Sequence, residues 1–315
     1  MQQYLICKYI IMKTLIFLII LILPPSWLYS QQIADTIYSP KIHNPEYDLG
    51  KGPTVFIDQG HHNFHTKNGR YKAFSNLLER DGYIVKEYDD VFRKSELGKE
   101  EILVISNALN EINVEDWFLP NPSAFSKDEI KIVKRWVRKG GSLFLIADHM
   151  PMAGAAKDLA AEFDFEFTNG FVFDTVTRGP AFFNVKQKNL VESIITKGRD
   201  TSETVYQVAT FTGQGFKIPD DATPILIFGE NYVNILPDTA WVFEKETPRF
   251  SVEGWSQGAY KKYGKGKIVA FGEAAMFTAQ LGGPNQIKMG MNNIAAPENY
   301  QLLLNIIHWL DGNLE

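Results

Sequence analysis

The feature that most constrains the fold of this 315-residue chain is an alternation of strand-like and helix-like segments between residues 54 and 165. Short apolar runs are typical of buried strands, whereas apolar residues spaced three and four apart are typical of helices. The expected strands span residues 54–60, 83–90, 101–109 and 142–148, and the expected helices span 71–83, 126–141 and 153–165. Such alternation predicts right-handed crossovers and a doubly wound, mostly parallel α/β sheet.

Two of these helices carry local signals of their own. Phe74, Leu77 and Leu78 fall on one helical face, which predicts that this face packs on the sheet. Ser126 is followed three residues later by Glu129, which is the pattern of a capping box at a helix start. The helix over 126–141 should therefore begin at Ser126.

The second half of the chain is less regular and reads mainly as β-structure. The expected strands span residues 166–174, 203–211, 223–229, 239–244, 250–264 and 266–277, and an amphipathic helix over 298–310 follows. The last two strands predict a hairpin through Gly264 and Gly266. We expect antiparallel additions to the sheet and a loop-rich excursion at about 170–250, within a single α/β domain over residues 53–312.

The first 30 residues have the layout of a secretory signal peptide. Lys13 precedes an apolar run over residues 15–23, and Pro24, Pro25 and a short polar exit follow. The apolar run is too short to span a bilayer. The sequence therefore predicts a secreted or periplasmic protein without stable membrane insertion after cleavage, followed by an exposed lead-in over residues 31–52. An uncleaved anchor is the alternative interpretation.

Composition excludes several classes of function. Cleavage near Ser30 would remove Cys7, the single cysteine, together with two lysines, and would change the formal charge from −5 to −7. A chain without a thiol has no disulfide, cysteine nucleophile or thiolate metal site. A mildly acidic protein without a Lys/Arg run is not expected to bind nucleic acid or anionic membranes.

Histidines cluster after two of the expected strands. Three of the six histidines, His61, His62 and His65, fall within five residues and follow Asp58. A fourth histidine, His149, directly follows a strand-like run, beside Asp148. If these strands are parallel neighbours, both groups open at the carboxyl edge of one sheet, where open α/β sheets bind ligands. We therefore expect His61 or His65 to approach Asp148 or His149.

The order of several motifs resembles a known family. GPTVFIDQGHHNFHT, LLERDGYIV, ILVISNAL, WVRKGGSLFLIADHMP, YGKGKIVAFGEAAMF and LLLNIIHWL together resemble the class I glutamine amidotransferase-like proteins of unknown function in bacterial envelopes, across most of residues 50–312. The resemblance implies a flavodoxin-like sheet flanked by helices. Relatives of this type sometimes accompany glycan-degrading hydrolases.

One departure from that family limits the expected chemistry. In true amidotransferases a cysteine nucleophile occupies the turn after the strand that matches SLFLI, and a histidine and a glutamate follow late in the chain. Here the turn is Asp148-His149-Met150-Pro151, and the late strand offers Glu273 without a neighbouring histidine. Glutamine hydrolysis through a thioester is thus excluded, and the fold transfers better than the activity.

A metal site is one interpretation of the histidine cluster. A metal hydrolase needs three or four His, Asp or Glu ligands around an open coordination position. Asp58, His61 and His65 are the candidate ligands, with Asp148 and His149 nearby, and one divalent metal such as zinc would be the cofactor. The spacing matches no strong signature such as HExxH. The alternative is that His61 and His62 only bind loop carbonyls and shape a turn.

A metal-free interpretation uses His149, Asp148 and Glu273 as catalytic residues. A histidine paired with a carboxylate can move protons near neutral pH, and two carboxylates in one cleft can have different pKa values. Glu273 directly follows a buried-looking strand. A charged residue there is either hydrogen-bonded to a helix start or part of the site.

Other polar residues are candidates for substrate binding. Asn107, at a strand end, would bind a hydroxyl or form a turn, and Arg178 would bind a carboxylate such as a uronate or be a solvated loop residue. Gln214 and Gln280 lie in glycine-flanked stretches that suggest loops over a ligand. His308, between Ile307 and Trp309 on the last helix, is expected to be structural.

These residues favour a secreted hydrolase-like protein that acts on a small polar substrate, with a glycan fragment as the leading example. The expected partner is thus a small molecule or oligosaccharide. The alternative is a non-catalytic module that binds a ligand or a protein on a degenerate amidotransferase fold. Stoichiometric metal would favour the enzyme, whereas a pocket with neither metal nor a titratable pair would favour the binding module.

Overall fold

The computed structural model describes residues 32–98 and 101–315. The expected signal peptide therefore lies outside the described residues. Within the two described ranges, no helix combines the length and apolar character that a membrane span requires.

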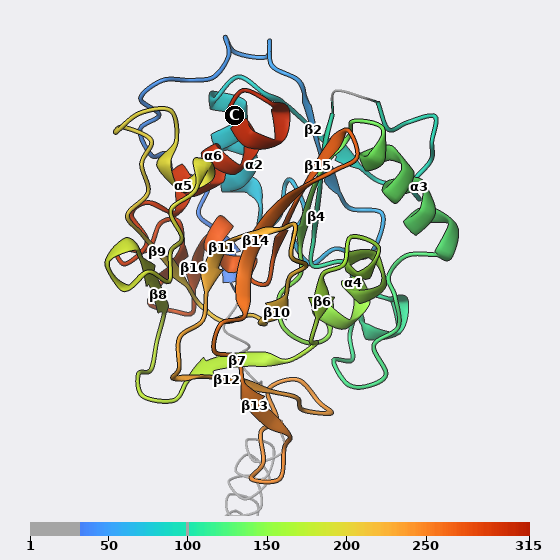
Figure 1. Ribbon diagram of the computed structural model, residues 1–315, viewed down its shortest axis with the longest axis vertical. Helices are drawn as coiled ribbons and strands as arrows, with labels where there is room; N and C mark the ends of the chain where they lie inside the picture. Colours follow the sequence, from blue (N-terminus) through green and yellow to red (C-terminus); the bar gives the residue numbers. More distant parts are fainter. Residues whose placement is uncertain (1–31, 99–100) are drawn as a thin grey trace, which may run out of the picture.

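A large mixed sheet forms the centre of the molecule (Figure 1). Its strand order is β3-β2-β4-β5-β15-β14-β10-β6, and β11 also pairs with β14. The first five strands in this order are parallel, and the others are antiparallel to their neighbours. The bounds are β2 (Thr54–Asp58), β3 (Ile84–Tyr88), β4 (Ile102–Ser106), β5 (Ser142–Ile146), β6 (Glu166–Phe167), β10 (Phe216–Lys217), β11 (Thr223–Ile227), β14 (Ser256–Tyr263) and β15 (Gly266–Phe271). The mostly parallel sheet with antiparallel additions that the sequence predicts is confirmed.

Helices cover both faces of this sheet. The helices are α2 (Lys72–Arg80), α3 (Lys127–Arg138), α4 (Met152–Ala161), α5 (Ile194–Lys197) and α6 (Asn299–Asp311). In β5, Phe144 and Ile146 belong to the core under α2 and α6, whereas Leu143 and Leu145 belong to the core under α3 and α4. Alternate side chains of one strand are thus buried on opposite faces, as expected for a sheet between two helical layers.

The ends of two helices agree with the sequence signals. Phe74, Leu77 and Leu78 are buried on α2. Ser126 accepts a hydrogen bond from the Glu129 amide, and the Glu129 side chain returns to the Ser126 amide, so the predicted capping box is confirmed. Helix α6 differs from the amphipathic helix expected, because residues 301–310 are all buried between the sheet, α5 and β9.

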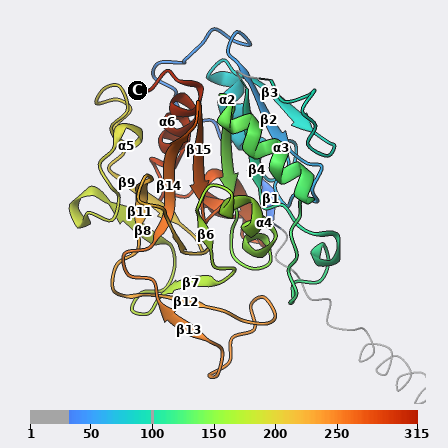
Figure 2. The same cartoon turned by 45° about the vertical axis from the view of Figure 1, so that its right-hand side comes forward.

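Smaller antiparallel sheets and short 3₁₀ turns surround the central sheet (Figure 2). The sheets are β1 (Gln32–Ala34) with β16 (Ala279–Gly282) and β17 (Ile287–Gly290), β13 (Arg249–Ser251) with β12 (Tyr232–Ile235) and β7 (Phe171–Asp174), and β8 (Ala181–Asn184) with β9 (Gln207–Thr210). The turns are η1 (Glu111–Asn113), η2 (Val185–Gln187) and η3 (Ala275–Phe277). The β7–β12–β13 sheet lies beyond the carboxyl ends of the parallel strands in both views.

Two segments differ from the sequence expectations. Residues 239–244 were expected as a strand but form a loop, in which only Thr239 makes an isolated bridge, to Phe118. Trp241 has a left-handed backbone (φ 67°), which is incompatible with a strand. Part of the expected lead-in also joins the fold, since β1 pairs with β16 and Asp35 is buried.

Candidate functional site

A cavity of about 1040 Å³ lies at the carboxyl edge of the parallel strands. Ser106 of β4 and Phe271 of β15 both pair in register with Ile146 of β5. The residues that follow these strand ends therefore lie side by side, and those that line the cavity are Asn107, Asp148, His149 and Glu273. We call this cavity the strand-edge pocket.

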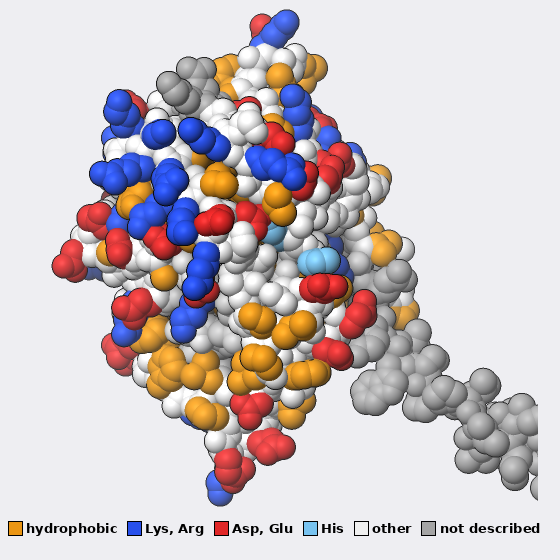
Figure 3. Space-filling view, turned by 90° about the vertical axis from the view of Figure 1, so that its right-hand side faces the viewer, with side chains coloured by type: hydrophobic (Ala, Val, Ile, Leu, Met, Phe, Trp, Pro, Cys, Tyr) orange, Lys and Arg blue, Asp and Glu red, His pale blue; other side chains and the backbone are white. Residues whose placement is uncertain are grey.

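Aromatic side chains form much of the remaining wall. They come from loops and from the β7–β12–β13 sheet, and they include Phe64, Trp117, Phe173, Phe211, Trp241 and Phe243. Trp241 is 52% exposed and Phe243 is 37% exposed. Hydrophobic side chains gather on the lower part of one face, at the level of this small sheet (Figure 3). The strand-edge pocket thus combines a polar floor with an aromatic rim.

Asn107 fixes the geometry of the pocket floor. Its backbone is left-handed (φ 49°), a conformation that asparagine tolerates. Its Oδ1 accepts a hydrogen bond from the Asp148 amide at 2.8 Å, and Asp148 Oδ1 in turn accepts one from the His149 amide at 2.9 Å. Asn107 therefore orders the β5 turn, which agrees with its interpretation as a turn former.

The imidazole of His149 is held in one tautomer. Its Nδ1 lies 2.7 Å from the carbonyl oxygen of Met150, which only accepts hydrogen bonds, so Nδ1 carries the proton. The ring stacks on Phe171 at 4.2 Å and meets Trp241 edge-on at 4.8 Å. No side chain or backbone group in the described ranges bonds to Nε2, so this nitrogen is left available to a ligand in the pocket that His149 lines.

Glu273 and Asp148 form an interacting pair of carboxyl groups. Glu273 is fully buried, and its two oxygens accept hydrogen bonds from the amides of Ala275 at 2.9 Å and Met276 at 2.8 Å, at the start of η3. Burial raises the pKa of Glu273 well above its usual range, and the nearby Asp148 raises it further. Glu273 thus satisfies both sequence interpretations, because it binds a helical turn and also lines the pocket.

His65 contributes a neutral imidazole to the pocket wall. Burial, with a smaller contribution from Arg70, lowers its pKa to about 3. Its ring packs on Tyr71 at 4.8 Å, and its Nδ1 has no hydrogen-bond partner within residues 32–98 and 101–315. At neutral pH this side chain can exchange a hydrogen bond with a ligand, but it carries no charge.

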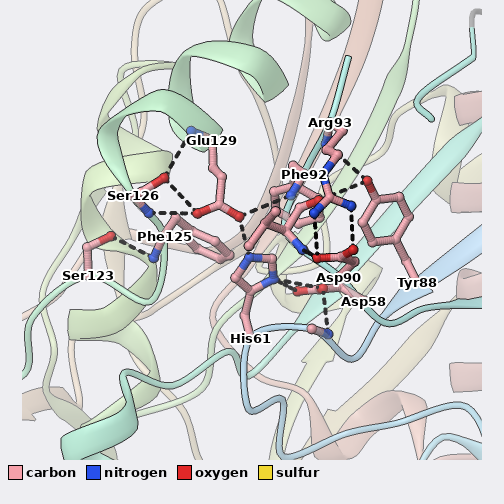
Figure 4. Close-up of polar contacts among 12 residues, drawn as sticks. Asp58, His61, Tyr88, Asp90, Phe92, Arg93, Ser123, Phe125, Ser126 and Glu129 are labelled. Carbon is pink, nitrogen blue, oxygen red and sulfur yellow. Dashed lines mark hydrogen bonds and ion pairs between the residues drawn. The ribbon is translucent and has the colours of Figure 1, made fainter. Parts of the chain in front are cut away.

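His61 lies outside the pocket, in a buried hydrogen-bond network with Asp58 and Glu129 (Figure 4). Its Nδ1 lies 2.8 Å from Asp58 Oδ1, and its Nε2 lies 2.8 Å from Glu129 Oε1. Both ring nitrogens are therefore occupied by carboxylates, and Glu129 also caps α3. Of the two histidines expected to approach Asp148 or His149, only His65 shares a cavity with them.

The structure does not gather the expected metal ligands. Asp58 and His61 bond to each other away from the pocket, whereas His65 lines it. No group of three or more His, Cys, Asp or Glu side chains in the described part of the chain has the arrangement of a metal site. The expected ligand set of Asp58, His61 and His65 is therefore divided between the strand-edge pocket and the buried network around His61.

We expect the His61 network to make stability depend on pH. Although burial opposes protonation, Asp58 and Glu129 raise the pKa of His61 above its usual value. A raised histidine pKa contributes stability that is complete below the unfolded value of about 6.5 and is lost as pH rises through the folded value. His61→Gln should destabilise the fold at pH 6 by about 2–4 kcal/mol and abolish this pH dependence, as measured by urea unfolding.

The neighbouring histidine provides a matched control for that experiment. His62 is exposed and has a left-handed backbone (φ 49°), so His62→Asn should change stability by less than about 0.5 kcal/mol. If His61→Gln instead retains the pH dependence of the wild type, the charged network is not its source.

Two expected substrate-binding residues have different positions. Gln214 is fully buried and does not line the pocket. Its Oε1 accepts from the Thr168 amide at 2.8 Å and its Nε2 donates to the Ala147 carbonyl at 3.0 Å, so it joins two loops instead of covering a ligand. Arg178 is exposed, lines the pocket and makes no ion pair within the described residues.

His308 is buried with its Nε2 2.7 Å from Asp81, so its expected structural role is confirmed.

Sequence reasoning missed several pocket residues. Trp117 was not among the candidate residues and Trp241 was expected within a strand, yet both line the pocket. Thr210 and Gln257 line it as well, and they lie within strands whose pattern gives no functional signal. Gln280 also lines the pocket, and the glycines that follow it were its only functional signal in the sequence.

Comparison with solved structures concerns the fold alone. The chain is similar to the mmIFT52 N-terminal domain, with 12% identity and a TM-score of 0.54 over 82% of this chain and 97% of that one. It is also similar to a cytoplasmic protein from Salmonella typhimurium LT2 (13% identity, TM-score 0.46, 82% and 97% covered) and to a ThuA-like protein from Parabacteroides merdae ATCC 43184 (12% identity, TM-score 0.41, 82% and 90% covered). No protein-family model and no curated protein matches the sequence. The mixed α/β fold is therefore shared with the first of these structures.

Proposed function

We propose that this protein is a hydrolase of a small polar substrate, with a glycan fragment as the favoured class, and that Asp148, His149 and Glu273 carry the chemistry. The observation that supports this most is that Asp148, His149 and Glu273 line one large pocket, in which burial and the nearby Asp148 raise the pKa of Glu273. A carboxyl group whose pKa is raised can stay protonated and act as an acid at a pH at which a neighbouring group acts as a base.

The proposed roles follow from the hydrogen bonds. Glu273, with its raised pKa, would donate a proton to the leaving-group oxygen. His149 Nε2, which has no hydrogen-bond partner within the described residues, would take a proton from the attacking water, and Asp148, the preceding residue on the same turn, would stabilise the resulting positive charge. The water oxygen bonds to the electrophilic carbon as the bond to the leaving oxygen breaks. One proton passes from Glu273 to the leaving oxygen, and one passes from the water to His149.

The aromatic rim supports a sugar as the substrate. Sugar rings present apolar C–H faces and a polar edge, and aromatic side chains offer a flat surface to such faces. Trp241 lines the pocket and is half exposed, and the ring centroids of Trp117 and His149 lie 6.1 Å apart. A sugar ring stacked on either tryptophan would lie near His149 on the polar floor.

We also propose that the fold derives from flavodoxin-like, glutamine amidotransferase-like proteins, and that the protein is secreted. The parallel strands have the order β3-β2-β4-β5-β15, which corresponds to the order 2-1-3-4-5 of flavodoxin-like sheets. Secretion rests on the sequence of residues 1–30 alone.

The hydrolase proposal can be tested with a substrate panel. Fluorogenic aryl glycosides and unmodified oligosaccharides would be incubated with the protein between pH 5 and pH 8, and products would be separated by chromatography. Glu273→Gln should lose about 100-fold or more of the turnover, because the proton donor is removed. Glu253→Gln, at an exposed position, is the matched control. Equal turnover by Glu273→Gln and the wild type would refute the role of Glu273.

A non-catalytic binding module is the second candidate. It is supported by the hydrogen bonds of Glu273, because a carboxylate that only holds η3 in place would make the same two contacts. In that case calorimetry should detect oligosaccharide binding by the wild type, while prolonged incubation yields no product.

A further inference from the structure

We propose that the strand-edge pocket recognises a neutral, hydroxyl-rich ligand through three buried oxygens, Thr210 Oγ1, Gln257 Oε1 and Gln280 Oε1. We call these three side chains the acceptor wall. The inference rests on the proposed function in that it names the ligand class of the same pocket. It concerns binding, however, and does not require turnover.

The acceptor wall is assembled from three separate elements. Thr210 ends β9, Gln257 lies in β14 and Gln280 lies in β16. All three residues line the pocket together with Glu273, and each is only 1% exposed. Their three oxygens have no hydrogen-bond partner within the part of the chain that the structure describes.

The hydrogen bonds of Gln257 fix which end of its amide is unpaired. Its Nε2 donates to the carbonyl oxygen of Thr212 at 2.9 Å. A carbonyl oxygen only accepts, so the amide cannot be reversed without losing this bond. Gln257 therefore keeps Oε1 as the unpaired end.

Gln280 is fixed by a hydroxyl group in the same way. The Thr278 hydroxyl donates to the Ala275 carbonyl at 2.7 Å, so its oxygen must accept from Gln280 Nε2, which lies 2.8 Å away. The donor of the amide is thus used within the protein, and Oε1 is left over. Both glutamines of the acceptor wall consequently present hydrogen-bond acceptors.

This arrangement selects for ligands that carry donors. A buried acceptor without a partner costs about 1–3 kcal/mol, and a ligand hydroxyl would remove that cost. A carboxylate or phosphate group has no hydrogen to donate to the two glutamine oxygens, which only accept, and the charge of Asp148 in the same pocket would repel it. A neutral sugar offers hydroxyl donors at every position, including C6, whereas a uronate replaces the C6 donor with a charged carboxylate that the glutamine oxygens cannot bind and that Arg178 alone would attract.

The ligand class can be tested by calorimetry in the Glu273→Gln background, in which turnover does not interfere. The probes are short oligomers of mannose and galactose and the matching oligomers of mannuronate and galacturonate, in which a carboxylate replaces the C6 hydroxymethyl group. The neutral oligomers should bind about tenfold or more tightly than their acidic counterparts. Equal or tighter binding of the acidic oligomers, or no binding of any neutral oligomer at millimolar concentration, would overturn the inference.

The role of the wall itself can be tested with Thr210→Val, which removes an unpaired oxygen at nearly constant volume. Binding of the neutral oligomer should weaken about fivefold, because one hydrogen bond to the ligand is lost. The melting temperature should stay equal or rise, because no protein hydrogen bond is lost. Thr201→Val, at an exposed position, is the matched control.

A second variant, Gln280→Met, removes another acceptor and should weaken binding further when combined with Thr210→Val. If both variants lower the melting temperature and leave the dissociation constant unchanged, the oxygens stabilise the fold, for instance through bound water, and the inference fails. If the binding pattern holds while the wild type turns over no glycan, the acceptor wall stands and the hydrolase proposal fails.

Discussion

Asp148→Asn is expected to stabilise the folded protein at pH 8 while it reduces turnover about 100-fold or more. Asn keeps the Oδ1 acceptor that binds the His149 amide, so the turn should retain its shape. The variant removes the negative charge that helps to raise the pKa of Glu273. A residue that favours catalysis would thus be unfavourable for stability, as is common at active sites.

The pH dependence follows from the direction of the Glu273 shift. A carboxyl group whose pKa is raised by folding stabilises the protein fully below its unfolded pKa, near 4.5, relative to higher pH. That contribution is lost as pH rises through the folded pKa. Removing the Asp148 charge lowers the pKa of Glu273 in the folded protein, so less stability is lost at high pH. The melting temperature should therefore rise by about 2–4 °C at pH 8 and change little at pH 4.

Differential scanning calorimetry of Asp148→Asn at both pH values would measure this effect. Asp158→Asn, on the exposed side of α4, is the matched control and should show no such pH-dependent difference. A lower melting temperature for Asp148→Asn at pH 8 would mean that Asp148 stabilises the turn more than it repels Glu273.

The sequence predicts the parallel half of the sheet better than the antiparallel half. Strands such as β4 and β5 are buried along their whole length, so their apolar runs are continuous and easily recognised. Residues 239–244 have a similar apolar pattern, yet Val242 and Phe243 lie in an exposed loop that borders a pocket. Local hydrophobicity does not distinguish a paired strand from an aromatic rim, because both contain Trp, Val and Phe.

The candidate site shows the same limit. Strand ends are visible in the sequence, so the sequence alone predicts that Asp148, His149 and Glu273 lie at one edge of the sheet. The separation of His61 from His65 could not be predicted, because it depends on how a short loop turns. His61 faces Asp58 and Glu129, whereas His65 lines the pocket. The acceptor wall was also hidden, since its residues come from strands that meet only in the folded chain.

His149→Phe and His149→Ala should separate the chemical role of the imidazole from its packing role. Phe keeps a ring against Phe171 and Trp241 but leaves the Met150 carbonyl unpaired, at a cost of about 1 kcal/mol. Ala removes the ring as well and should cost about 2–4 kcal/mol. Thermal unfolding of the two variants would measure this difference.

Turnover should fall in both variants, although their stabilities differ. Neither Phe nor Ala can accept a proton from water, so kcat should decrease about 100-fold or more in each. The KM of the Phe variant should stay near that of the wild type, because the aromatic wall is preserved. If His149→Phe instead retains full kcat while His149→Ala unfolds early, the imidazole contributes only its ring to the pocket. The base that activates water would then have to be Asp148, which lies on the same turn and has a second carboxylate oxygen beside the one that binds the His149 amide.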